Sequence, residues 1–149
     1  MSYEEYLNKN GSLTYGNKGV SMLPLLREGR DLFTVRKKEA KRCKAGEVVL
    51  YRREPDQYVL HRIIKVRPKD YVILGDNCIN MEYGITDEDI LGVMTGFVRD
   101  GKKYSIDALG YRIYSFVWLH TAGLRIVVKK CVLKIRRICR KHGRKSYGD

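Results

Sequence analysis

Short runs of β-branched and aromatic residues, separated by turn-forming residues, make up most of the chain from residue 31 to residue 106. Six such runs span residues 32–35, 48–51, 58–60, 63–66, 71–74 and 90–94. Gly, Pro, Asp and Asn lie between them and favour turns, because each adopts or stabilises backbone angles that turns require. We therefore expect a mainly β domain whose hairpins turn at residues 52–57, 67–70 and 100–101.

Beyond residue 110 the hydrophobic spacing changes to steps of three and four residues. Five apolar residues follow this spacing: Leu124, Val128, Cys131, Ile135 and Ile138. Lys and Arg occupy the other positions, so the pattern predicts a C-terminal basic amphipathic helix. Gly123 is expected to separate it from a shorter aromatic helix around residues 114–118. The chain then divides into a β domain, residues 1–109, and a helical basic tail, residues 110–149.

The charge of the chain is concentrated in this tail. The whole sequence carries a formal net charge of +13, and residues 110–149 hold eleven Lys or Arg and one acidic residue. Such a helix can pack on the β domain, lie on an anionic membrane surface through residues 111–141, or bind nucleic acid. Core packing and membrane association are equally supported, and nucleic acid is the third choice.

Cysteine and histidine positions argue against a metal centre or a disulfide scaffold. The four cysteines have no C-x-x-C spacing, and the three histidines lie far apart in the sequence. No glycine-rich phosphate-binding loop is present either. We therefore expect reduced thiols, no metal and no cofactor.

The hydrophobic stretches are too short for a transmembrane helix. The longest segment without a charged residue, 113–124, falls below the ~18 apolar residues that a span needs,. The first ten residues have neither the basic nor the apolar region of a secretory signal. We expect a cytoplasmic protein that can bind peripherally to the inner face of the membrane.

Ser21 and His61 are the candidates for nucleophilic chemistry. A serine hydroxyl becomes an effective nucleophile when a neighbouring base takes its proton, and a turn can place backbone N–H groups beside it as an oxyanion hole. Ser21 follows Gly19 in Gly-Val-Ser-Met-Leu-Pro. His61 can act as a base near neutral pH without deep burial.

Four segments resemble, in order, the conserved boxes of the type I signal peptidases and the LexA-type self-cleaving repressors. They are G-V-S-M-L-P-L-L-R-E-G-R-D-L at 19–32, G-E-V-V-L-Y at 46–51, H-R-I-I-K-V at 61–66 and G-D-N at 75–77. The resemblance implies a signal-peptidase/LexA-like β-sheet fold with Ser21 as nucleophile. His61, where many relatives have Lys, places the chain with the endoplasmic-reticulum and archaeal branch and implies a Ser-His pair.

The resemblance also implies an acid beside His61, and two candidates remain open. Asp76 lies in the G-D-N box, and Glu82 follows it where relatives have Asp. Tyr83 replaces the Arg that usually comes next. Some relatives supply an oxyanion hydroxyl two residues before the nucleophile, and Gly19 cannot provide one. Asp76 can also cap its own turn, and Glu82 can be a solvated loop charge.

The resulting hypothesis is a serine endopeptidase that cleaves a leader or precursor peptide through an acyl-enzyme at Ser21. Its partner is then a peptide or protein substrate. The alternative is a catalytically weak or inactive module that binds an extended peptide on the same fold, with the tail on a membrane or on nucleic acid. Autocleavage as a repressor is not expected, because only twenty residues precede Ser21.

Overall fold

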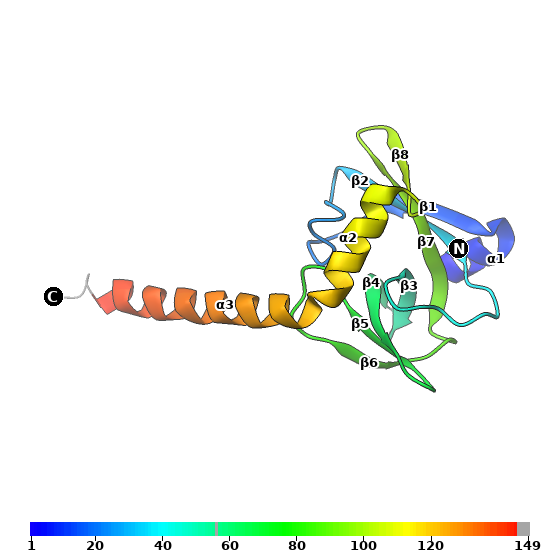
Figure 1. Cartoon of the computed structure of the whole chain (residues 1–149). Helices are drawn as coiled ribbons and strands as arrows, with labels where there is room; N and C mark the ends of the chain where they lie inside the picture. The colour runs from blue at the N-terminus through cyan, green and yellow to red at the C-terminus, as the bar shows by residue number, and fades with distance from the viewer. Residues whose placement is uncertain (56, 146–149) are drawn as a thin grey trace.

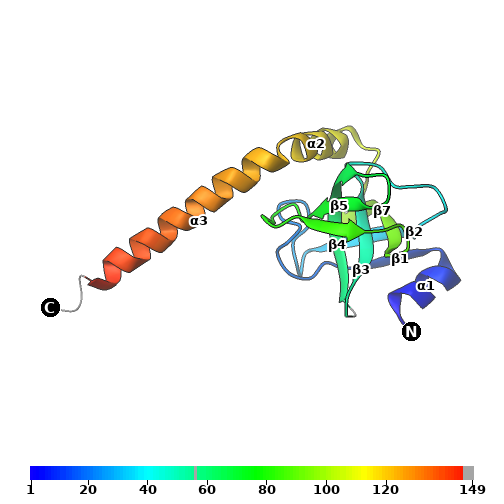
Figure 2. The same ribbon diagram turned by 90° about the horizontal axis from the view of Figure 1, so that it is seen from below.

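The fold was analysed in a computed structural model that describes residues 1–55 and 57–145 (Figures 1 and 2). It is mainly β, as the sequence predicts: the strands form one antiparallel sheet, accompanied by three helices. In chain order the elements are α1 (Tyr3–Asn10), β1 (Ser12–Gly16), β2 (Asp31–Lys37), β3 (Val48–Arg53), β4 (Gln57–Val66), β5 (Tyr71–Leu74), β6 (Glu82–Ile85), β7 (Ile90–Arg99), β8 (Lys102–Ser105), α2 (Leu109–His120) and α3 (Ala122–Lys145).

The strands pair in the order β1-β2-β7-β3-β4-β5-β6, and β8 pairs with β7. The three predicted hairpins are confirmed as β3–β4, β4–β5 and β7–β8. The runs 58–60 and 63–66 prove to be one strand, β4. His61 and Arg62 join them because both continue the pairing with β3, opposite Val49 and Val48.

Helix α1 was not expected, although the sequence carries its end signals. The Ser2 side chain accepts a hydrogen bond from the Glu5 N–H, and the Glu5 carboxylate accepts one from the Ser2 N–H. This reciprocal capping box satisfies two N–H groups that a helix start otherwise leaves unpaired. Gly11 ends the helix with φ of 74°, a left-handed conformation that glycine adopts without strain,. Leu7 fixes α1 to the sheet by burying its side chain.

The main hydrophobic core lies between α1, the sheet and the loop that joins β1 to β2. Met22 and Leu26 from that loop are fully buried with Leu7 and Val35. A second core, on residues of β3, β4, β5 and β7, surrounds Tyr51, Ile63, Tyr71 and Ile73. The loop that contains Ser21 is therefore anchored in the core on both sides of Pro24.

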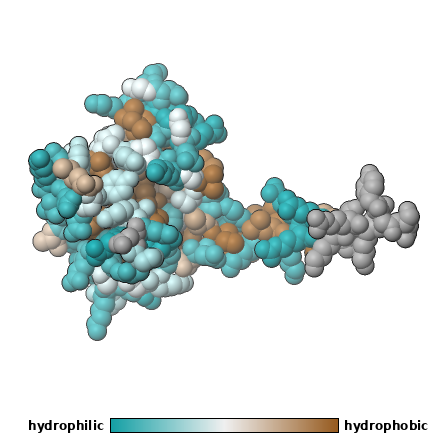
Figure 3. Space-filling view, turned by 180° about the vertical axis from the view of Figure 1, so that it is seen from behind, coloured by the Kyte–Doolittle hydropathy of each residue, from teal (hydrophilic) through white to brown (hydrophobic). Residues whose placement is uncertain are grey.

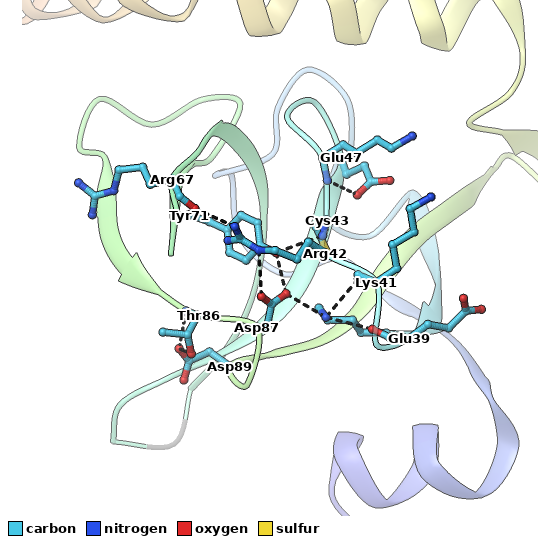
Figure 4. Close-up of polar contacts among 12 residues, drawn as sticks. Glu39, Lys41, Arg42, Cys43, Glu47, Arg67, Tyr71, Thr86, Asp87 and Asp89 are labelled. Atoms are coloured by element: carbon cyan, nitrogen blue, oxygen red, sulfur yellow. Dashed lines mark hydrogen bonds and ion pairs between the residues drawn. The ribbon is translucent and has the colours of Figure 1, made fainter. Parts of the chain in front are cut away.

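The long loop between β2 and β3 is held by polar contacts to the far edge of the sheet (Figure 4). Asp87 is the centre of these contacts: it accepts a hydrogen bond from the Tyr71 hydroxyl (2.6 Å) and pairs with Arg42 (3.2 Å) and Lys38 (2.9 Å). These contacts hold the pKa of Asp87 below its usual range, although its partial burial opposes them. The network therefore ties this loop to the sheet.

The C-terminal helices behave differently along their length (Figures 1 and 2). Helix α2 and the first two turns of α3 lie against the β domain, where Ala122 and Ile126 are buried with Leu74. The remainder of α3 projects away from the sheet. The two helices meet at Thr121, two residues before Gly123, which lies inside α3. Within residues 1–55 and 57–145, no helix is long and apolar enough to cross a membrane.

Candidate functional site

The loop that carries Ser21 is fixed by its own polar contacts as well as by core packing. Asn17 is buried, and its amide donates hydrogen bonds to the carbonyls of Gly19 and Leu26, both at 3.5 Å. Gly19 has φ of 74° and donates its N–H to Glu28 (3.0 Å). A left-handed residue held in this way turns the chain sharply, and Ser21 follows directly after that turn.

His61 lies in the middle of β4 and is buried, with 7% of its side chain exposed. Its Nδ1 atom lies 3.2 Å from the Tyr51 hydroxyl and 3.3 Å from Glu82 Oε1. Burial lowers the pKa of His61 below its usual 6.5, the Glu82 carboxylate opposes this, and the Arg53 guanidinium adds to it. The imidazole is therefore neutral near pH 7, as a general base must be.

The partners of His61 assign its tautomer. Glu82 is paired with Arg53, whose Nε donates to Glu82 Oε2 at 3.0 Å. A carboxylate can only accept hydrogen bonds, so Nδ1 carries the ring hydrogen when it faces Glu82. Nε2 is then the basic nitrogen. In the triad arrangement a carboxylate at this position orients the ring and stabilises the imidazolium that forms during catalysis.

Asp76 has different partners from Glu82. Arg62 donates to both Asp76 oxygens at 2.8 Å, and the Tyr114 hydroxyl donates to Oδ2 at 2.8 Å. Arg62 and Asp76 each have only 1% of their side chain exposed. Within the described residues no hydrogen bond or ion pair joins Asp76 to His61. Of the two acids that the sequence left open, the contacts of His61 favour Glu82.

Gly75 lies between His61, Cys78 and the Ser21 backbone. A Cβ atom at this position would lie 2.9 Å from His61 Nε2, 2.8 Å from the Ser21 carbonyl oxygen and 2.6 Å from Cys78 Sγ. Distances below 3.0 Å are too short for any real Cβ, so only glycine leaves these groups in place. Nε2 therefore points toward the Ser21 segment, and Nδ1 points toward Glu82.

Ser21 and His61 line one open cavity of about 410 Å³, together with Cys78 and Arg53. A base that takes the proton of Ser21 should lie within hydrogen-bond reach of Ser21 Oγ. In the part of the chain that the structure describes, no hydrogen bond joins these two side chains. Catalytic hydrogen bonds are often long without substrate and shorten when it binds. Because both side chains line the same cavity, they can reach the same bound molecule.

The backbone of Ser21 has one free donor and one engaged acceptor. Asn77 donates its N–H to the Ser21 carbonyl (2.8 Å) and its side-chain amide to the Val20 carbonyl (3.0 Å). The N–H of Ser21 has no hydrogen-bond partner among residues 1–55 and 57–145. An unpaired N–H beside a nucleophile is what an oxyanion hole requires.

The C-terminal helices contact this site through the 75–77 turn. The Asp76 carbonyl accepts from Trp118 Nε1 and from Arg125, each at 2.9 Å. Lys129 Nζ donates to Asn77 Oδ1 at 2.5 Å and also to the Asn77 carbonyl. Helices α2 and α3 thus hold the 75–77 turn that in turn holds the Ser21 loop. The sequence carries no signal for this, because the contacts link residues more than forty positions apart.

Across the residues that the structure describes, no group of three or more His, Cys, Asp or Glu side chains is arranged to hold a metal ion. Burial also raises the pKa of the Cys78 thiol, so the sulfur beside His61 stays protonated near neutral pH,.

Comparison with known proteins adds no assignment: no protein-family model, no curated protein and no solved structure matches the chain.

Proposed function

We propose that this chain is a serine endopeptidase of the signal-peptidase type, with Ser21 as nucleophile, His61 as general base and Glu82 as the acid that positions His61. The observation that carries the proposal is the orientation of the His61 ring. Its Nδ1 atom faces Glu82, and its Nε2 atom faces the Ser21 segment across Gly75. The sequence boxes support Ser21 and His61 independently, whereas the choice of Glu82 rests on the contacts of His61. The boxes also support a signal-peptidase/LexA-like arrangement of this mainly β fold.

The geometry supports a two-step acyl transfer. Ser21 Oγ attacks the scissile carbonyl while Nε2 of His61 takes its proton, and Glu82 stabilises the resulting imidazolium. The Ser21 N–H donates to the oxyanion of the tetrahedral intermediate. The C–N bond then breaks as Nε2 returns the proton to the leaving amine, leaving an ester on Ser21. Water, deprotonated by the same nitrogen, hydrolyses that ester.

The proposed substrate is an extended segment of a leader or precursor peptide. The cavity beside Ser21 is open to solvent and lined by apolar and aromatic groups, including Phe33, Leu50 and Tyr58. Such a lining suits apolar side chains near the cleavage point. The resemblance to signal peptidases adds a small residue, such as Ala or Gly, immediately before the scissile bond.

Acylation by an activated peptide ester with Ala at the acyl position tests the proposal without knowledge of the natural substrate. We expect one acyl group on Ser21 in the intact mass, and its loss in Ser21→Ala and His61→Ala. Matched controls are Ser12→Ala and His120→Gln, because both replace exposed residues outside the cavity. Circular dichroism confirms that each variant folds. Equal acylation of wild-type protein and Ser21→Ala would refute the proposal.

The second candidate is a peptide-binding module without catalysis. Two observations favour it: no hydrogen bond joins Ser21 to His61 in the described residues, and Gly19 supplies no oxyanion hydroxyl. Loss of one oxyanion donor costs about 3 kcal/mol of transition-state stabilisation. Under this alternative the wild-type protein binds extended peptides in the cavity but never becomes acylated, and Ser21→Ala binds them equally well.

A further inference from the structure

Helix α3 carries an apolar stripe that nothing in the described structure covers. The stripe consists of Leu124, Val127, Val128, Cys131, Val132 and Ile135. Leu124, Val127, Val128 and Ile135 are each more than half exposed, whereas Ile126, on the opposite side of the helix, is buried against the sheet. The helix therefore packs through one face and presents its apolar stripe to solvent. Figure 3 shows brown and teal surface alternating along the projecting part of α3.

The cations of α3 lie beside this stripe. Residues 122–140 contain seven Lys or Arg and no acidic residue. Arg125 and Lys129 contact the 75–77 turn, as described above. The other five, Lys130, Lys134, Arg136, Arg137 and Arg140, are exposed, and no ion pair in the described part of the chain uses them.

Charge decides which partner fits the stripe. Leu124, Val128, Cys131 and Ile135 alternate at four- and three-residue steps, which a helical dimer could use. A second copy, however, would bring another seven cations and no acid to the same interface. Val127 and Val132 also make the stripe wider than a coiled-coil seam. Nucleic acid would neutralise the cations but leave the apolar stripe in water.

We propose that α3 docks on the surface of a lipid bilayer that contains anionic headgroups. An amphipathic helix that lies in the interface buries its apolar face among the acyl chains, and Lys and Arg on its polar face contact the headgroups. Both features of α3 are then satisfied at once. Helix α2 also carries exposed apolar side chains, at Leu109, Ile113 and Phe116. The inference requires no residue of the Ser-His site.

Vesicle flotation with the full-length protein tests this docking. We expect binding to phosphatidylcholine vesicles that contain phosphatidylglycerol and little binding to pure phosphatidylcholine. Val128→Gln with Ile135→Gln should weaken binding by at least about tenfold, since each side chain loses its apolar burial. Lys134→Gln with Arg136→Gln should weaken it by about fivefold per cation removed. Val66→Gln removes an exposed apolar side chain from β4 and serves as the matched control.

Three results would overturn the docking. The first is equal affinity for neutral and anionic vesicles. The second is unchanged vesicle binding by the Val128→Gln/Ile135→Gln variant. The third is a dimer in sedimentation velocity that this same variant abolishes, which would assign the stripe to a second copy. Ser21→Ala should bind vesicles like the wild-type protein, so failure of the docking and failure of the proposed catalysis are separately visible.

Discussion

Asp76 and Glu82 lie six residues apart in the sequence, yet the two carboxylates occupy opposite surroundings. Asp76 is closed off from solvent and saturated by Arg62 and Tyr114, whereas 22% of the Glu82 side chain is exposed and it contacts His61 and Arg53. Asp76 pairs with Arg62, and Glu82, which pairs with Arg53, also contacts His61, the neighbour of Arg62 on β4. Successive residues of a strand point to opposite faces of the sheet. The two carboxylates therefore meet side chains that leave β4 in opposite directions.

The largest expected effect is on the rate of acylation, and it comes from replacing Glu82. Glu82→Gln keeps the size of the side chain but removes the charge that orients and stabilises His61. We expect the acylation rate with the activated Ala ester to fall by about 10³- to 10⁴-fold, as in triads that lose their acid. The free energy of unfolding should change little. A rate within threefold of the wild type would mean that Glu82 is only a surface charge.

Asp76→Ala should act on stability. The substitution leaves the Arg62 guanidinium buried without its counter-charge, which costs about 3–5 kcal/mol in the free energy of unfolding. Urea denaturation measures this loss. Asp76→Leu combined with Arg62→Met removes both charges and should recover part of it. If Asp76→Ala were as stable as the wild type but could not be acylated, Asp76 and not Glu82 would be the positioning acid.

The pKa of His61 gives a further comparison of Glu82 with Asp76. Because the Glu82 carboxylate raises the pKa of His61, Glu82→Gln should lower that pKa below its already depressed wild-type value. Asp76 also raises the pKa of His61, but more weakly, so Asp76→Asn should produce a smaller decrease. An NMR titration of the His61 ring measures both variants. A larger decrease in Asp76→Asn would contradict the assignment of Glu82.

The same depressed pKa makes stability depend on pH. His61 binds its proton more weakly in the folded state than in the unfolded state, where its pKa is near 6.5. Its contribution to stability is therefore complete above pH 6.5 and decreases as the pH falls from there toward the folded pKa. His61→Gln should remove this decrease, which unfolding curves recorded at a series of pH values will show.

Replacing Arg53 should have the smallest effect on stability and on the acylation rate. Arg53 pairs with Glu82 but is 40% exposed, and such partly exposed pairs contribute roughly 1 kcal/mol or less,. Arg53→Gln should leave the free energy of unfolding within that range and should raise the pKa of His61, since the guanidinium lowers it. Acylation should slow only modestly, by about tenfold or less. A larger loss would show that Arg53 holds Glu82 in place.

Most strands were predictable from the sequence because their signal is local, whereas β1 and β6 lie outside the predicted runs. Runs such as 71–74 alternate with turn formers, and this pattern needs no knowledge of distant contacts. Helix α1 was predictable in principle as well, through the Ser2–Glu5 capping box and Gly11. The end of α2 was misplaced by two residues, because Gly123 continues the helix that follows Thr121.

The site was predictable only in part, for a physical reason. Ser21 and His61 stand in sequence boxes that carry their own signal. The choice between Asp76 and Glu82 depends on how β5 and β6 fold back beside β4, which the spacing of residues does not reveal. The same holds for Tyr51, whose position beside His61 follows from strand register. Burial and the Glu82 carboxylate raise the pKa of Tyr51, so its hydroxyl stays protonated next to the imidazole.

Gly75 offers a criterion for comparing chains that carry the same sequence boxes. A single added methyl group at this position would meet the Ser21 backbone, which cannot move aside as a flexible side chain would. A chain that keeps Ser21, His61 and Glu82 but carries alanine or a larger residue here lacks the space that lets these groups face one another. If the proposed function holds, such a chain should bind peptide without becoming acylated.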